Sequence, residues 1–210
     1  MVQKKAPIIL ELFSGAKTVS GVFEKNGWNT WSVDNNPKLN PSICCNILDI
    51  IPGMLPYQIH FIWASPPCTT FSRATNPKHW EKKTLKYRRY IYLPKTPEAY
   101  NSLLLLQKTI EIISWFPDVF FVIENPVGRI QHMNPLQKLG HFRYFVNYFD
   151  FGKPYSKETY LFSNVWLPFS LKKYKTIAPG MSTIRNVQAR ASVPALLIEN
   201  IYNYIFYHKT

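Results

Sequence analysis

Short apolar segments that alternate with helical patterns are the feature that most limits how this chain of 210 residues can fold. Five of these segments are expected to form strands, over 7–13, 28–33, 43–45, 60–64 and 119–123. Between them, the patterns predict a helix over about 18–25 and a longer one over about 97–115, which Thr96 and Pro97 open as the N-cap and first helical residue. This alternation predicts an α/β fold: a doubly wound, Rossmann-like, mostly parallel sheet with helices on both faces.

The last third of the chain is richer in strand signals. Residues 144–149 and 159–162 are expected to be strands, and a final helix is expected to open near Ser192. The sequence has no internal repeat, and its length suits one complete hydrophobic core. We therefore expect a single domain over 1–210.

The charge of the chain is strongly positive. Lys and Arg number 25 against 12 Asp and Glu, a formal net charge of +13. Such a surface attracts polyanions, so nucleic acid is the natural partner, although a basic surface can also serve solubility alone. The segment 78–95 combines seven of these cations with Trp80 and three tyrosines, and we predict that it is an exposed loop. Because cations neutralise phosphates and aromatic rings stack on unpaired bases, the loop is expected to close over nucleic acid.

Several classes of protein and site are not expected. No apolar run approaches the roughly 20 residues of a membrane span, and residues 1–7 lack the apolar region of a signal peptide, so we expect a soluble, intracellular protein. The 3 cysteines are an odd number and are interpreted as thiols. The scattered histidines have no metal-ligand spacing, which predicts no metal.

Chemically informative residues follow four of the predicted strands. They are the segments 11–15 (Glu-Leu-Phe-Ser-Gly), Asp34, 65–68 (Ser-Pro-Pro-Cys) and 124–126 (Glu-Asn-Pro). In an open parallel sheet, ligands bind at the carboxyl ends of the strands. We therefore expect the four loops to converge on one site.

Each of these loops has a functional and a structural interpretation. Gly15 suits a tight turn near a ligand and Asp34 suits a ribose hydroxyl, which together suggest an adenosine-bearing cofactor, but a turn and a cap would look the same. Two prolines present Cys68 as an exposed nucleophile, or merely accompany a half-buried structural cysteine. Glu124 interrupts an apolar run, so its carboxyl is partly desolvated and suited to proton donation, or caps the strand.

The order of these motifs resembles the cytosine-5 DNA methyltransferase family, particularly its short phage and viral members. The matching pieces are Phe13-Ser-Gly15 for the cofactor loop, Asp34 for the ribose-binding acid, Pro67-Cys68 with Phe71-Ser72 for the catalytic Pro-Cys loop, and Glu124-Asn125 for the Glu-Asn motif. Further along, Tyr155 to Phe162 resembles a later basic motif, and Gln188 to Ile201 resembles the final helix that returns to the cofactor site.

The resemblance implies an S-adenosylmethionine-dependent methyltransferase that acts on carbon 5 of cytosine in DNA. It implies that Cys68 attacks carbon 6 of the base and that Glu124 protonates or hydrogen-bonds ring nitrogen 3. The residues expected at the cofactor are Phe13, Ser14, Gly15, Ala16, Lys17, Thr18, Asp34, Asn35, Asn46, Asp49 and Pro66. The residues expected at the nucleic acid are Ser72, Arg73, Lys82, Lys83, Arg88, Arg89, Asn125, Lys157 and Thr159.

The sequence also departs from the family pattern. Lys17 and Thr18 stand where the cofactor loop normally has further glycines, and Thr159 stands where a second arginine is common. The acid at the adenine corresponds to Asn46 or to Asp49. The segment between Phe162 and Gln188 is too short for a large target-recognition domain, so sequence specificity is expected to be low or supplied by a partner.

Three other functions remain open from the sequence. An amino-methyltransferase also has a Pro-Pro motif after its fourth strand, but normally follows it with an aromatic residue, where this chain has Cys68. The same chemistry on RNA is compatible with the charge, because both polymers carry phosphates. A catalytically inactive nucleic-acid-binding relative would explain the departures, but not the presence of both Cys68 and Glu124.

Overall fold

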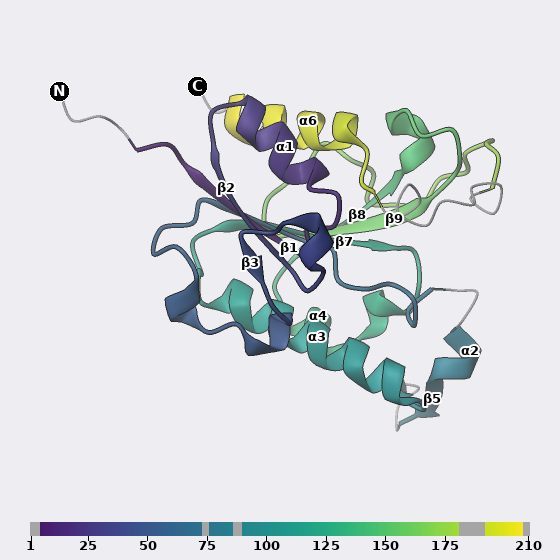
Figure 1. The fold of residues 1–210 in the computed structure, drawn as a ribbon. Coiled ribbons are helices and arrows are strands. Elements are labelled where there is room, and N and C mark those ends of the chain that lie inside the picture. The colour runs from purple at the N-terminus through teal and green to yellow at the C-terminus, as the bar shows by residue number, and fades with distance from the viewer. Residues whose placement is uncertain (1–4, 73–75, 86–89, 181–191, 208–210) are drawn as a thin grey trace.

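A seven-stranded sheet forms the centre of the molecule in the computed structural model, which describes residues 5–72, 76–85, 90–180 and 192–207 (Figure 1). Its strands are β1 (Ile8–Leu12), β2 (Asn29–Asp34), β3 (Ile43–Cys44), β4 (Phe61–Ala64), β7 (Phe120–Pro126), β8 (Phe142–Asn147) and β9 (Glu158–Ser163). Their order is β3-β2-β1-β4-β7-β9-β8. The first five strands are parallel, whereas β9 runs antiparallel to both β7 and β8. This is the predicted doubly wound, Rossmann-like and mostly parallel sheet, and an antiparallel pair completes it at one edge.

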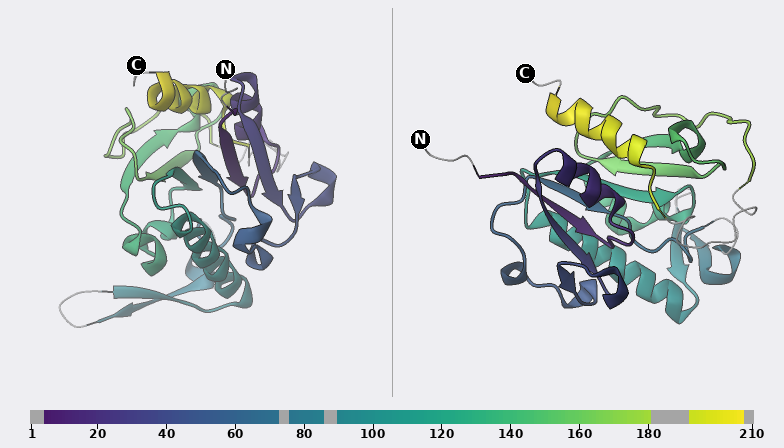
Figure 2. Two further views of the ribbon diagram at one scale, coloured as in Figure 1. Left: turned by 90° about the vertical axis from the view of Figure 1, so that its left-hand side faces the viewer. Right: turned by 45° about the horizontal axis from the view of Figure 1, so that its top comes forward.

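Helices cover both faces of the sheet, as predicted (Figures 1 and 2). Helices α1 (Thr18–Lys25) and α6 (Ala195–Tyr202) lie together on one face, and α3 (Pro97–Ser114) and α4 (Asn134–Lys138) lie on the other. Short helical turns complete the connections: η1 (Pro37–Leu39), η2 (Ile47–Asp49), η3 (Pro52–Met54), η5 (Arg129–His132), η6 (Tyr148–Phe151) and η8 (Asn203–Tyr207). None of the described helices is long and apolar enough to cross a membrane.

Burial explains why the central strands read as continuous apolar runs. All four residues of β4 are buried, and its two faces contribute to separate hydrophobic clusters on the two sides of the sheet. Helix α3 begins as expected, because the Thr96 side chain accepts a hydrogen bond from the backbone N–H of Ala99 and Pro97 is the first helical residue.

The basic segment 78–95 differs from the predicted exposed loop. After the short helix α2 (Asn76–His79), it forms an antiparallel hairpin of β5 (Trp80–Thr84) and β6 (Tyr90–Pro94), which projects from the body of the molecule in Figure 2. The buried Trp80 anchors this hairpin: its ring stacks on Phe71 at 5.4 Å between centroids, and its indole N–H donates to the carbonyl of Thr70 at 2.9 Å. Arg73, Arg88 and Arg89 lie outside the described residues.

A smaller difference concerns the predicted strand 144–149. Strand β8 starts two residues earlier and ends at Asn147, after which the chain turns into η6. Gly152 ends that turn with φ of 86°, a left-handed conformation that glycine adopts without strain. Tyr148 is therefore the first residue of this turn and not part of the predicted strand.

Candidate active site

The four predicted loops meet at one edge of the sheet. Val33, Leu12, Ala64 and Ile123 are register neighbours across β2, β1, β4 and β7, so the residues that follow them emerge side by side. They surround a cavity of about 360 Å³. The cavity is lined by residues of the loops after β1, β4 and β7, including Phe13, Gly15, Pro66, Cys68 and Glu124. The convergence expected from the sequence is therefore present.

Cys68 follows the two prolines at the end of β4 and lines this cavity. Its carbonyl accepts hydrogen bonds from the backbone N–H groups of Phe71 and Ser72, both at 3.0 Å, so the segment forms a closed turn. Of the two alternatives that the sequence left open for Cys68, an exposed nucleophile or a half-buried cysteine, the observed exposure is that of the second. Burial raises the pKa of the Cys68 thiol and the charge of Glu124 raises it further, while the Lys157 ammonium opposes both. The thiol is consequently protonated near neutral pH, because these influences favour its neutral form.

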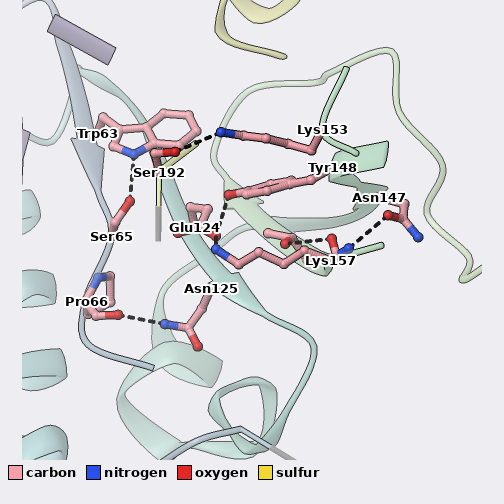
Figure 3. A network of polar contacts seen from close by, with 11 residues as sticks. Trp63, Ser65, Pro66, Glu124, Asn125, Asn147, Tyr148, Lys153, Lys157 and Ser192 are labelled. Atoms are coloured by element: carbon pink, nitrogen blue, oxygen red, sulfur yellow. Dashed lines mark hydrogen bonds and ion pairs between the residues drawn. The ribbon is translucent and has the colours of Figure 1, made fainter. Parts of the chain in front are cut away.

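Glu124 is buried near the carboxyl end of β7 and faces the same cavity (Figure 3). The phenol of Tyr148 donates a hydrogen bond of 2.6 Å to its Oε1 atom. The Nζ of Lys157 lies 3.7 Å from the same oxygen and 4.6 Å from the centroid of the Tyr148 ring. A buried carboxylate is stable only when it is paired and hydrogen-bonded, and these two residues meet that requirement.

Asn125 connects the loops after β4 and β7. Its Nδ2 donates to the carbonyl of Pro66 at 2.8 Å, and the side chain is 1% exposed. On the other side of this loop, the indole N–H of Trp63 donates to the Ser65 hydroxyl at 2.9 Å (Figure 3). The contact of Asn125 with nucleic acid stays a prediction; in this structure the side chain is buried and joins the two segments.

The first loop is shaped by unusual backbone angles. Phe13 and Gly15 have φ of 59° and 48°, and the Gly15 N–H donates to Oδ2 of Asp34 at 3.0 Å. The Ser14 hydroxyl is buried, lines the cavity and has no hydrogen-bond partner among the described residues. A buried polar atom without a partner is costly, so this hydroxyl suits a polar group of a ligand.

A second, smaller cavity of about 110 Å³ extends the site toward β2 and β3. It shares Phe13 and Pro67 with the larger one, and Asp34, Asn35 and Asn46 also line it. The two cavities together form an elongated site that an adenosine-bearing cofactor could occupy. Four other residues expected at the cofactor line the larger cavity: Ser14, Ala16, Thr18 and Pro66.

Two of the expected cofactor residues lie elsewhere. The ammonium group of Lys17 donates to the carbonyl of Asn40, and Lys17 lines neither cavity. Asp49 is exposed at the end of η2 and also lines neither cavity, whereas Asn46 lines the smaller one. Of the two candidates for the adenine contact, the structure therefore favours Asn46, whose Oδ1 also accepts the N–H of Leu48 at 3.0 Å.

The other residues expected at the nucleic acid lie in four different places. Lys82 and Lys83 are exposed on β5, where the Nζ of Lys82 lies 4.2 Å from the centroid of the Tyr90 ring. Lys157 lines the larger cavity. Thr159 is 0% exposed and its hydroxyl donates to the carbonyl of Lys157 at 3.2 Å, so its contact with bases stays a prediction. Ser72 pairs with Gly128 in an isolated bridge.

Sequence reasoning missed several residues of the site. Tyr148 was assigned to a strand, and nothing local indicated its contact with Glu124, 24 positions away. Gly128 was not selected, yet a Cβ there would lie 2.2 Å from the carbonyl oxygen of Phe71. The one available signal is that Gly128 comes two residues after the Glu-Asn-Pro segment, where glycine permits close backbone approach.

Comparisons with known proteins identify a similar viral protein and solved structures of the same fold. No protein-family model matches the chain. A protein of Frog virus 3 (isolate Goorha) named "Probable DNA (cytosine-5)-methyltransferase" is 28% identical over 166 residues, which are 75% of this chain and 70% of that protein.

Two solved structures share the fold. The Entamoeba histolytica methyltransferase EhMeth is 16% identical with a TM-score of 0.52 over 82% of this chain. An E. coli protein assigned as a DNA modification methyltransferase encoded within a prophage is 16% identical with a TM-score of 0.51 over 75% of this chain. The chain spans 58% and 46% of the lengths of these two proteins. The viral match confirms the resemblance to cytosine-5 DNA methyltransferases that the ordered motifs indicate, and the two solved structures share the fold of this chain.

Proposed function

We propose that this protein transfers a methyl group from S-adenosylmethionine to carbon 5 of cytosine in DNA through a covalent adduct with Cys68. The observation that carries the proposal is the juxtaposition of Cys68 and Glu124. Cys68 lies in the loop after β4, and Glu124 lies near the carboxyl end of the adjacent parallel strand β7. Both line one cavity together with the loop after β1. A nucleophile and a buried carboxyl in the same cavity are the two groups that this chemistry requires.

The residues after β1 and β2 fit the cofactor. Asp34 presents a carboxylate beside the smaller cavity, suited to ribose hydroxyls, and the unpartnered hydroxyl of Ser14 is available to the methionine portion. Asn46 is placed to contact the adenine. When bound, S-adenosylmethionine supplies an electrophilic methyl group.

The chain's own residues perform the remaining steps. The target cytosine leaves the base stack, since its reactive face is unreachable in a duplex. The Cys68 thiolate adds to carbon 6 while Glu124 protonates or hydrogen-bonds ring nitrogen 3, so that carbon 5 becomes nucleophilic and accepts the methyl group. Loss of the carbon-5 proton then expels the cysteine. Burial raises the pKa of the Cys68 thiol and the Lys157 ammonium opposes this shift. In the proposed mechanism the thiol proton passes to the Glu124 carboxylate in the same cavity, which can then protonate ring nitrogen 3.

The hairpin of β5 and β6 supplies a surface for the nucleic acid. It begins shortly after the catalytic turn and exposes Lys82 and Lys83, and Arg129 stacks its guanidinium 3.9 Å from the centroid of the Tyr92 ring. Cations of this kind bind phosphates without regard to sequence. We propose that target selection rests on the shape of the cavity or on a specificity partner.

Incubation with tritiated S-adenosylmethionine and separate DNA and RNA acceptors tests the proposal. We expect label in DNA, recovered as 5-methylcytosine, from the wild type and none from Cys68→Ser, which should still bind the cofactor. Label recovered only in RNA would show that the substrate is RNA and not DNA. Label on an exocyclic amino group, or full activity of Cys68→Ser, would contradict the mechanism.

A further inference from the structure

The carboxyl of Glu124 is held by a residue that the family motifs do not include. Tyr148 begins the turn η6 after β8 and is fully buried. Its phenol donates to Oε1 of Glu124 at 2.6 Å, a short hydrogen bond between a neutral donor and a carboxylate (Figure 3). Burial raises the pKa of the Tyr148 phenol well above its ordinary value, and the charge of Glu124 raises it further. The phenol therefore remains a donor at all pH values at which the protein would work.

Lys157 contacts the same carboxylate oxygen. Its Nζ is 3.7 Å from Oε1 of Glu124 and lies over the ring of Tyr148. Among the described residues, both polar contacts of the carboxylate thus fall on one oxygen. Since Glu124 lines the cavity that also contains Cys68, its other oxygen, Oε2, is left for a ligand in that cavity.

The positions of Tyr148 and Lys157 are fixed by the backbone as well as by their side chains. The Tyr148 N–H donates to the carbonyl of Lys157, and the Lys157 N–H donates to Oδ1 of Asn147, both at 3.1 Å. The Nδ2 of Asn147 in turn donates to the Ser156 hydroxyl at 2.8 Å. The phenol is consequently presented to Glu124 by a rigid turn and not by a mobile loop.

We propose that Tyr148 is a positioning residue, whose phenol holds Oε1 of Glu124 so that Oε2 faces the target base above Cys68. The inference rests on the proposed function, because it assigns a purpose to the orientation of Glu124. Tyr148 would touch neither base nor cofactor. Its contribution would arise through Glu124 alone, because a displacement of about 1 Å in a reacting group can cost about 100-fold in rate.

The test compares Tyr148→Phe with Tyr144→Phe. Tyr144 is equally buried in the same hydrophobic cluster, and its phenol accepts the Leu167 N–H at 3.0 Å, away from Glu124. The Phe ring preserves the packing at both positions and removes one hydroxyl. We expect kcat of Tyr148→Phe to fall by about 10-fold to 100-fold, with KM for DNA and the cofactor Kd within about twofold of wild type. Tyr144→Phe should lose thermal stability but keep kcat.

A double-mutant cycle with Glu124→Ala separates positioning from general structure. If Tyr148 acts through Glu124, Tyr148→Phe has no further effect on the residual rate of Glu124→Ala. The inference is overturned if kcat of Tyr148→Phe equals that of wild type, if Tyr144→Phe loses as much, or if the effect of Tyr148→Phe persists fully in Glu124→Ala. A wild type without methyltransferase activity would overturn the proposed function and this inference together, whereas the other outcomes leave the function intact.

Discussion

Asn125 and Pro66 are joined by a hydrogen bond of 2.8 Å that links the end of β7, which carries Glu124, to the loop after β4, which carries Cys68. The strands β4 and β7 are parallel neighbours in the sheet. The spacing of the nucleophile from the buried carboxyl therefore depends on a side chain that reaches neither the cavity nor the solvent.

Asn125→Ala should separate these loops. The carbonyl of Pro66 loses its partner, which costs about 1–3 kcal/mol when the group is buried, and the rate of methyl transfer should fall more than cofactor affinity. Asn26→Ala is the matched control, because Nδ2 of Asn26 also donates to a backbone carbonyl at 2.8 Å, that of Val22, outside the site. We expect both variants to lose stability in denaturant melts and only Asn125→Ala to lose activity. Equal activities of Asn125→Ala and Asn26→Ala would show that the hydrogen bond between Asn125 and Pro66 has no special part in catalysis.

Asp34→Asn should weaken S-adenosylmethionine binding. The carboxylate accepts the N–H groups of Gly15 and Asn36 and borders the smaller cavity, so a neutral amide loses charge-assisted bonds worth about 1.5–3 kcal/mol. Titration calorimetry should give a Kd raised by about 10-fold to 100-fold. Asp150→Asn, at an exposed carboxyl that accepts the Tyr174 phenol, should bind as wild type does. An unchanged Kd for Asp34→Asn would show that S-adenosylmethionine does not bind beside Asp34.

Glu11 should make folding stability depend on pH. Burial raises the pKa of this carboxyl from 4.5 to about 7, although Ser20 and the Lys17 charge oppose the shift. The folded state therefore binds the proton more tightly, and the resulting stability is complete below pH 4.5 and is lost as pH rises through 7. The loss is on the order of 3 kcal/mol.

The measurement is the free energy of unfolding in urea between pH 4.5 and 8, with pH-matched Glu11→Gln. Glutamine keeps an acceptor for the Ser20 N–H but cannot titrate, so its curve should lack this decline. Glu24→Gln, at an exposed carboxyl of α1, should follow the wild type. A wild-type curve parallel to that of Glu11→Gln would show that Glu11 does not titrate as described.

The hairpin should contribute to nucleic-acid affinity without sequence preference. Replacing Lys82 and Lys83 with alanine removes two exposed cations of β5, and each lost phosphate contact should reduce the slope of log K against log salt by about 0.7–0.9. Lys5 and Lys25, which are exposed outside the hairpin, provide a control of equal charge. Cofactor affinity should hold in both double variants. If the two slopes are equal, the hairpin has no special part in binding.

The sequence predicted those parts of the structure that depend on local patterns. The buried run 60–64 and the apolar residues before Glu124 could only be central strands, and the rule for parallel sheets then brought Cys68 and Glu124 to one edge. Contacts between distant segments were not predictable. Glu124 and Tyr148 are 24 positions apart, and no local pattern relates a buried carboxyl to a partner so distant in the sequence.

The hairpin was missed for a different reason. Its strands bury little beyond Trp80, and exposed lysines hide the alternation that marks a half-buried strand. Contacts between side chains of the two strands, such as that of Lys82 with Tyr90, stabilise the hairpin. Such a cross-strand contact can be predicted only when the register of the two strands is known.

Covalent trapping on DNA that contains 5-fluorocytosine tests the central claim most directly, because fluorine blocks the elimination that releases Cys68. In the presence of S-adenosylmethionine, the wild type and Cys44→Ser, at an exposed thiol outside both cavities, should form an adduct that survives denaturing electrophoresis. Cys68→Ser should form none while binding the cofactor normally. Methylation of ordinary cytosine by the wild type without an adduct, or an undiminished adduct with Cys68→Ser, would contradict the assignment of Cys68 as the nucleophile.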